Sequence, residues 1–150
     1  MRRSNRLSSE VGTASLEFIV AGVLLLVPLV YLVVALSVIQ SAALAVEGAA
    51  RQAARVFVVA PTAEEGRASV ETAVEFALAD HGVDPSAVLV DITCAPHPDA
   101  CHTRRGFVTV TVGVEVPLPL VPSALGGTFP VAVPVEARTT QQVSRFWGAG

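Results

Sequence analysis

An unbroken apolar stretch constrains this chain more than any other feature. From Phe18 to Val46 the sequence carries no charged residue, and the segment FIVAGVLLLVPLVYLVVALSVI alone exceeds the roughly 20 apolar residues that a helix needs to cross about 30 Å of hydrocarbon. The chain as a whole is also apolar, with 52% hydrophobic residues and a mean hydropathy of +0.60. The stretch therefore predicts one membrane-spanning helix.

A cleavable secretory signal is the competing interpretation of this stretch. The apolar core of such a signal usually runs about 7 to 15 residues and precedes a small-x-small cleavage site. Residues 41–45 could imitate that site. The length of the apolar stretch favours a retained span.

Arginine sets the expected orientation, because the chain contains no lysine. Three arginines lie within the first six residues, whereas Arg51 and Arg55 follow the span at some distance. Positive flanks tend to stay cytoplasmic. We therefore expect a single-pass protein of the plasma membrane with a cytoplasmic N-terminus and an extracytoplasmic chain after about Gln40.

Beyond the span, residues 41–59 are expected to continue the helix as a stalk. Glu47 and Arg51 have the i, i+4 spacing of a helical ion pair. The many alanines of this segment have two interpretations, between which the sequence does not decide. Small side chains let a helix pack closely against partner helices, but alanine is also the best helix former.

A second, amphipathic helix is expected after Pro61. Thr62-Ala63-Glu64-Glu65 matches a capping box, and Gly82 is suited to a left-handed cap at the far end. Between them an apolar stripe recurs at helical spacing. The stripe consists of Val70, Ala73, Val74, Ala77 and Leu78.

Three later runs alternate apolar and polar residues as strands do: residues 87–93, 107–116 and 129–140. The first two are expected to pair as a hairpin, and Pro130 and Pro134 favour an edge position for the third, because proline cannot donate to the ladder. We predict an α+β fold with a transmembrane helix and stalk over residues 13–60. In residues 61–150 one helix packs on a three-stranded antiparallel sheet.

The proline-rich bridge PLPLVPSALGG, residues 117–127, cannot be regular throughout. It could be an exposed surface for a partner or for the membrane, or a loop packed over the open end of the sheet.

Two cysteines flank a turn-rich hexapeptide. Cys94 and Cys101 could close a short disulfide loop, as is common outside the cytosol. The alternative is a zinc site that adds His97 and His102. Their spacing matches no standard zinc pattern, and Cys101 and His102 would point apart in an extended chain, so we expect a disulfide and no metal.

No catalytic motif is recognisable, and we expect neither an enzyme nor a cofactor nor a small-molecule substrate. His81, His97 and His102 have no obvious serine or paired carboxylate beside them, and Asp99 reads as a solvated loop residue. Removal of residues 1–12 would take away three arginines and one glutamate, leaving seven basic and twelve acidic residues, a net charge of −5. Such a body repels nucleic acid.

A glycine and a glutamate mark the start of the span. Gly12 ends a short basic leader, and Glu17 is the fifth residue after it. This arrangement resembles type IV prepilins and pseudopilins. The resemblance implies that a prepilin peptidase cleaves between Gly12 and Thr13 at the cytoplasmic face, removes the leader 1–12 and leaves the span in place. A residue without a side chain lets a membrane-embedded peptidase approach the backbone closely.

Cleavage would give Glu17 a partner. It creates a positive amine on Thr13, one helical turn from Glu17, and a charge near hydrocarbon costs a few kcal/mol unless it is paired. The resemblance implies that this pairing, within one subunit or between neighbours, sets the axial register of packed N-terminal helices. The alternative is that Glu17 is only an interfacial residue of a signal anchor.

Further motifs resemble the TadE-like family of tight-adherence (Flp) pilus proteins, of the actinobacterial type. They are GTASLEFIV, which contains the Glu17-Phe18 pair, then AVEGAARQAARVF after the span, and more loosely the strands and proline-rich bridge. The likeness is strong over residues 12–57. Pro28 departs from it, since it lies a turn or more deeper than in many relatives and shifts any kink.

Two functions follow from these observations. The first is a TadE-like pseudopilin, a structural or assembly protein of Flp pili, whose partners are the prepilin peptidase, other pilin or pseudopilin subunits and the pilus assembly machinery. The alternative is a single-pass, membrane-anchored extracytoplasmic binding module unrelated to pili. A mature N-terminus at Thr13 supports the first, and an intact Met1 supports the second.

Overall fold

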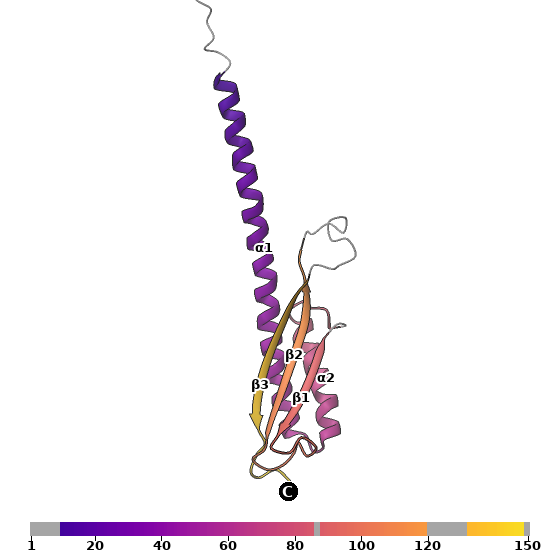
Figure 1. Cartoon of the computed structure of the whole chain (residues 1–150). Coiled ribbons are helices and arrows are strands. Elements are labelled where there is room, and N and C mark those ends of the chain that lie inside the picture. Colours follow the sequence, from indigo (N-terminus) through magenta and orange to yellow (C-terminus); the bar gives the residue numbers. More distant parts are fainter. Residues whose placement is uncertain (1–9, 86–87, 120–131, 149–150) are drawn as a thin grey trace, which may run out of the picture. The chain divides into compact units, whose positions relative to one another are not determined.

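Two helices and one three-stranded sheet make up the described part of the chain, in the order α1-α2-β1-β2-β3 (Figure 1). The computed structural model describes residues 10–85, 88–119 and 132–148. The fold is α+β, with a long apolar N-terminal helix, as the sequence predicts. The chain divides into two units, one ending at Leu36 and the other beginning at Ser37.

Helix α1 runs from Glu10 to Val59 without interruption at Pro28. Its first part exposes many more large apolar side chains than a helix in water does. For example, Phe18 is 80% exposed and Leu25 is 72% exposed. Only 6% of its most apolar window is buried, and by length and composition it is the one helix of the described residues that could cross a membrane. This part is compatible with a single-pass membrane anchor, in which a helix satisfies its own backbone hydrogen bonds.

The last part of α1 is a core element of the second unit and not a stalk. Its alanines alternate with Val46 and Phe57 in one buried stripe that shares a hydrophobic core with α2 and the sheet. The buried alanines are Ala42, Ala45, Ala49, Ala50, Ala53 and Ala54. They do allow close packing, but against the chain's own domain. The unit therefore begins at Ser37, whereas a division at residue 61 would separate this helix from the core that it fills.

Helix α2, Ala63–Ala79, begins and ends where the sequence predicts. The Thr62 side chain accepts a hydrogen bond from the Glu65 amide at 3.2 Å. At the other end Gly82 adopts a φ of +67°, and the Val83 amide donates to the Leu78 carbonyl at 3.0 Å. These bonds satisfy backbone groups that a helix end leaves unpaired. The predicted stripe is confirmed. Val70, Val74 and Leu78 are buried, along with Gly66, and Ala73 and Ala77 beside them are partly buried.

The sheet is antiparallel with the order β1-β2-β3: Leu89–Ala95, Phe107–Pro117 and Ala132–Gln142. The centre of its core face is formed by the alternate valines of β2, all buried: Val108, Val110, Val112, Val114 and Val116. Helix α2 and the last part of α1 cover this face (Figure 1). The opposite face of β2 carries Thr109 and Thr111. The predicted edge position of the third strand is confirmed, and Pro134 lies on it.

Strand limits differ from the prediction by a few residues. β1 begins at Leu89 and ends at Ala95, two residues later at each end than the predicted run 87–93. β3 ends at Gln142, two residues after the predicted end of the run 129–140. Residue 87, residues 129–131 with Pro130, and residues 120–127 of the proline-rich bridge lie outside the described residues.

Candidate functional site

The predicted cleavage site lies in the first turns of α1. Gly12 and Thr13 follow its first residue, Glu10, by two and three positions. On a helix, residues four apart lie on one face about one turn from each other. The backbone therefore places Thr13 and Glu17 in the relation that an amine–carboxylate pair requires.

Glu17 is an exposed carboxylate at the start of an exposed apolar helix. It makes no hydrogen bond or ion pair with any residue that the structure describes, and its neighbour Phe18 is 80% exposed. A carboxylate near hydrocarbon is costly unless it is solvated or paired. Glu17 is thus available to headgroup water or to a group on another chain.

The two cysteines form a disulfide, as predicted, with 5.1 Å between their Cα atoms. Cys94 lies on the buried face of β1 in register with Val108, and Cys101 lies in the loop that leads to β2. The bond therefore closes the loop and does not join the two strands directly. It occupies both sulfur atoms of the alternative zinc site, and no cluster of metal-ligating side chains occurs among the described residues.

His102 stabilises the end of α1, a role that the sequence did not reveal. Its ring stacks between Phe57 and Trp147, with ring centroids 5.0 and 4.9 Å apart. Its Nε2 lies 2.9 Å from the Phe57 carbonyl oxygen. A carbonyl oxygen only accepts, so this nitrogen carries the proton. Trp147 Nε1 donates to the Ala60 carbonyl at 3.2 Å, and together these side chains cap the C-terminal carbonyls of α1.

The remaining residues considered for acid–base chemistry are dispersed. His97 and Asp99 are exposed in the disulfide loop, and His81 is exposed after α2. His81 lines a cavity of about 580 Å³. Ser41, Asp84 and Glu115 also line this cavity, whereas His97 and Asp99 are not among its lining residues.

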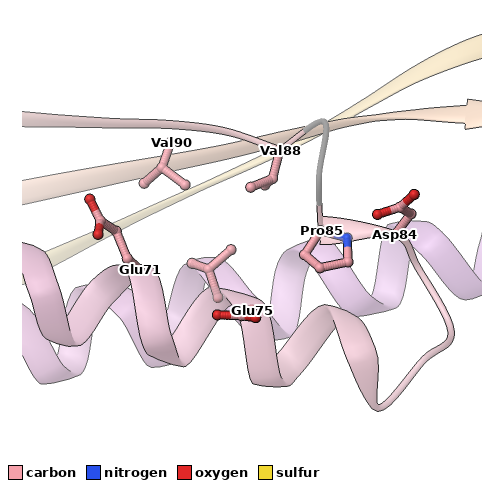
Figure 2. Close-up of a pocket in the computed structure, with 7 residues that line it drawn as sticks. Glu71, Glu75, Asp84, Pro85, Val88 and Val90 are labelled. Atoms are coloured by element: carbon pink, nitrogen blue, oxygen red, sulfur yellow. The ribbon is translucent and has the colours of Figure 1, made fainter.

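A groove between α2 and the start of β1 is a second feature that sequence reasoning missed. Its volume is about 350 Å³. Figure 2 shows Val90 of β1, and Val88 just before this strand, pointing toward α2, with Glu71 on the helix beside them. The lining consists of Glu71, Val74, Glu75, Asp84, Pro85, Val88 and Val90. The floor is apolar and the rim is acidic.

Comparisons with known proteins add no family to these observations. No family model, no curated protein and no solved structure matches the chain.

Proposed function

We propose that this chain is a TadE-like pseudopilin, a membrane-anchored structural or assembly protein of tight-adherence (Flp) pili that is processed after Gly12. In this proposal the N-terminus is cytoplasmic, and the unit that begins at Ser37 is extracytoplasmic. The partners are a prepilin peptidase, which removes residues 1–12, and other pilin or pseudopilin subunits with their assembly machinery.

One observation carries the proposal: Gly12 precedes Glu17 by five residues at the start of a long, exposed apolar helix. An ordinary anchor does not require a carboxylate at this place, since a charge there gains nothing from the hydrocarbon. A prepilin does have a use for it, because cleavage creates an amine on Thr13 one turn away.

The second unit supports an extracytoplasmic location. It contains a disulfide between Cys94 and Cys101, and disulfides persist in oxidising compartments. The arginines near the N-terminus favour the opposite side of the membrane for the leader.

The function assigned to Glu17 is assembly and not insertion. An isolated subunit keeps its new amine and its carboxylate in the wet headgroup layer at little cost. When N-terminal helices pack in a filament or an assembly platform, both charges enter a medium of low dielectric constant and must pair. Pairing then favours one axial register over others.

Fractionation of cells that carry Flp pili tests the proposal. The protein is detected separately in sheared surface filaments and in plasma membranes, in wild-type cells and in cells without the prepilin peptidase. We expect a species that lacks residues 1–12 in wild-type cells, and the full-length species in peptidase-deficient membranes. A full-length species in both strains would contradict the proposal and favour the membrane-anchored binding module.

A further inference from the structure

The groove between α2 and β1 has the chemistry of an arginine-binding site. Its floor contains Val74, 1% exposed, together with the half-buried Val88 and Val90. Glu71 and Glu75 stand at its rim, both exposed (Figure 2). Neither forms a hydrogen bond or an ion pair with a described residue. An apolar floor with carboxylates at the rim suits a side chain with an aliphatic stem and a cationic head.

A basic tip lies at the opposite end of the same strand. Arg104, Arg105 and Arg145 define it, all exposed. Arg104 donates to the Trp147 carbonyl at 2.9 Å, and Arg145 stacks on Phe146 at 4.5 Å. The side chain of Arg105 makes no hydrogen bond or ion pair within the described chain, so its charge is available to a partner.

Arg105 also occupies an unfavourable backbone conformation. Its φ is +61°, in the left-handed region that glycine adopts readily and other residues rarely adopt. Two bonds fix this turn: the Arg105 amide donates to the Val143 carbonyl at 3.2 Å, and Gln142 Nε2 donates to the Arg105 carbonyl at 3.2 Å. Strain of this kind is concentrated at functional sites.

The tip cannot reach the groove of its own chain. The groove opens beside Val90, whereas Arg105 lies beyond the other end of β1, where Ala95 pairs with Phe107. Five residues of strand separate Val90 from Ala95, a distance of about 17 Å. Any contact between tip and groove therefore joins two molecules.

We propose that Arg105 of one copy binds in the Glu71–Glu75 groove of the next copy. The occupant is a second copy of this chain, because the complementary charge is present on the same domain and free of internal partners. The two surfaces differ, so the contact is head-to-tail, and a pair of copies retains one open groove and one open tip. Such contacts propagate into open arrays. The inference rests on the proposed function only in that copies assemble side by side, with neighbours offset along the strand direction by about 17 Å.

The absence of lysine allows a direct test. Arg105→Lys introduces the only lysine of the chain, at the tip, and a carbodiimide then joins the new amine to a carboxylate with which it forms an ion pair. We expect the purified full-length variant in detergent, where no bilayer holds the copies at one level, to give a peptide in which the substituted residue is linked to Glu71 or Glu75. The link should join heavy-isotope and light chains when the two are mixed.

Two further variants act as controls for the cross-linking chemistry. Arg51→Lys should give an intrachain link to Glu47, because these residues form an ion pair at 2.7 Å. Arg138→Lys, on the threonine face of the sheet, should give no link to the groove. If Arg105→Lys gave no link to the groove while the Arg51→Lys control reacted, or gave links to other carboxylates, the inference would be overturned.

Neutral variants test whether the contact is head-to-tail. Arg105→Gln and Glu71→Gln/Glu75→Gln should each weaken self-association of the purified full-length protein, by up to about fivefold for each charge pair removed. An equimolar mixture should form dimers about as tightly as the wild-type chain does, but larger species should be weakened, because only one of its two possible contacts retains both charges. Larger species at the wild-type level in the mixture would contradict the inference.

Arg105→Gly separates the contact from folding. It relieves the positive φ, so we expect a higher unfolding midpoint together with a loss of self-association. Processing after Gly12 is read by mass in the same samples. Normal processing without tip–groove cross-links would refute this contact and leave the proposed function standing. Cross-links on a chain that is not processed would support the contact and contradict the proposed function.

Discussion

At the scale of single residues, Glu17 is the side chain whose chemistry most needs a partner from outside the described chain. It is exposed, it begins the apolar part of α1, and it makes no hydrogen bond or ion pair with a described residue. A carboxylate and an amine that enter a packed helix bundle together are tolerated, but either charge alone is not.

Glu17→Gln should therefore impair assembly and leave insertion intact. Glutamine keeps the size and the hydrogen-bonding capacity but removes the charge, so the Thr13 amine would enter the packed interface unpaired, at about 3 kcal/mol per subunit. Membrane level, leader removal and surface pilus yield are compared by immunoblotting, and only the pilus yield should fall.

Glu47→Gln is the matched control for this variant. It removes a carboxylate from the same helix at an exposed ion pair, where the expected effect is below about 1 kcal/mol. If Glu17→Gln cells produced as many pili as wild-type cells, Glu17 would be no more than an interfacial residue.

Gly66 gives a second prediction at this scale. A Cβ atom at this position would lie 3.0 Å from Cδ2 and 3.2 Å from Cε2 of Phe57, which is fully buried. Alanine gains up to about 1 kcal/mol of helix propensity over glycine, but overpacking a core costs about 1–3 kcal/mol. We expect Gly66→Ala to lower the free energy of unfolding by about 1 kcal/mol, measured in urea with Trp147 fluorescence.

Gly48→Ala provides the comparison for Gly66→Ala. It adds the same methyl group to a helix where nothing lies within 4 Å of the new atom. That variant should stabilise the protein by up to about 1 kcal/mol. Equal effects of the two substitutions would show that Phe57 does not require the space beside Gly66.

At the scale of elements, local signals predicted the strands, α2 and its caps. Alternation in β2 follows from one buried face, and Thr62 and Gly82 carry their capping chemistry in their side-chain types. The role of the last part of α1 was not predictable in this way. Alanines suit an isolated helix and a tightly packed one equally, so only the tertiary structure shows that Ala49 and Ala53 fill the core.

Contacts between distant parts of the chain were also not predictable from the sequence. His102 bonds to a carbonyl 45 residues away, and Trp147 to one 87 residues away. Neither spacing forms a recognisable motif. The cysteine pair was predictable because its two members lie seven residues apart around a turn-rich segment.

The disulfide loop gives a prediction at the element scale. Replacing both Cys94 and Cys101 with alanine should lower the free energy of unfolding by about 2 kcal/mol, the expected effect of closing so short a loop. The loss should appear in urea unfolding curves recorded without reductant. Addition of reductant should reduce the stability of the wild-type protein to that of the variant and leave the variant unchanged.

Peptide mapping without reductant checks the premise of this prediction. Protein from the membranes should yield the Cys94 and Cys101 peptides as one linked species. Two free thiols accompanied by stoichiometric zinc would restore the metal site that the disulfide excludes.

At the scale of the whole molecule, one helix participates in two different environments. Residues 10–36 form an apolar helix outside the hydrophobic core, and from Ser37 the same helix belongs to an α+β unit and contributes to that core. This continuity leaves no independent stalk over residues 41–59. Substitutions at Ala49 or Ala53 should accordingly act on folding of the unit, through overpacking, rather than on helix–helix association alone.

The N-terminus of the mature protein tests the central claim most directly. Intact-mass and N-terminal peptide analysis of protein from native membranes should find a chain that begins at Thr13. Gly12→Val should retain residues 1–12, because a branched side chain obstructs the approach of the peptidase, while membrane insertion remains normal. A wild-type chain that begins at Met1, or normal cleavage of the Gly12→Val variant, would contradict the account.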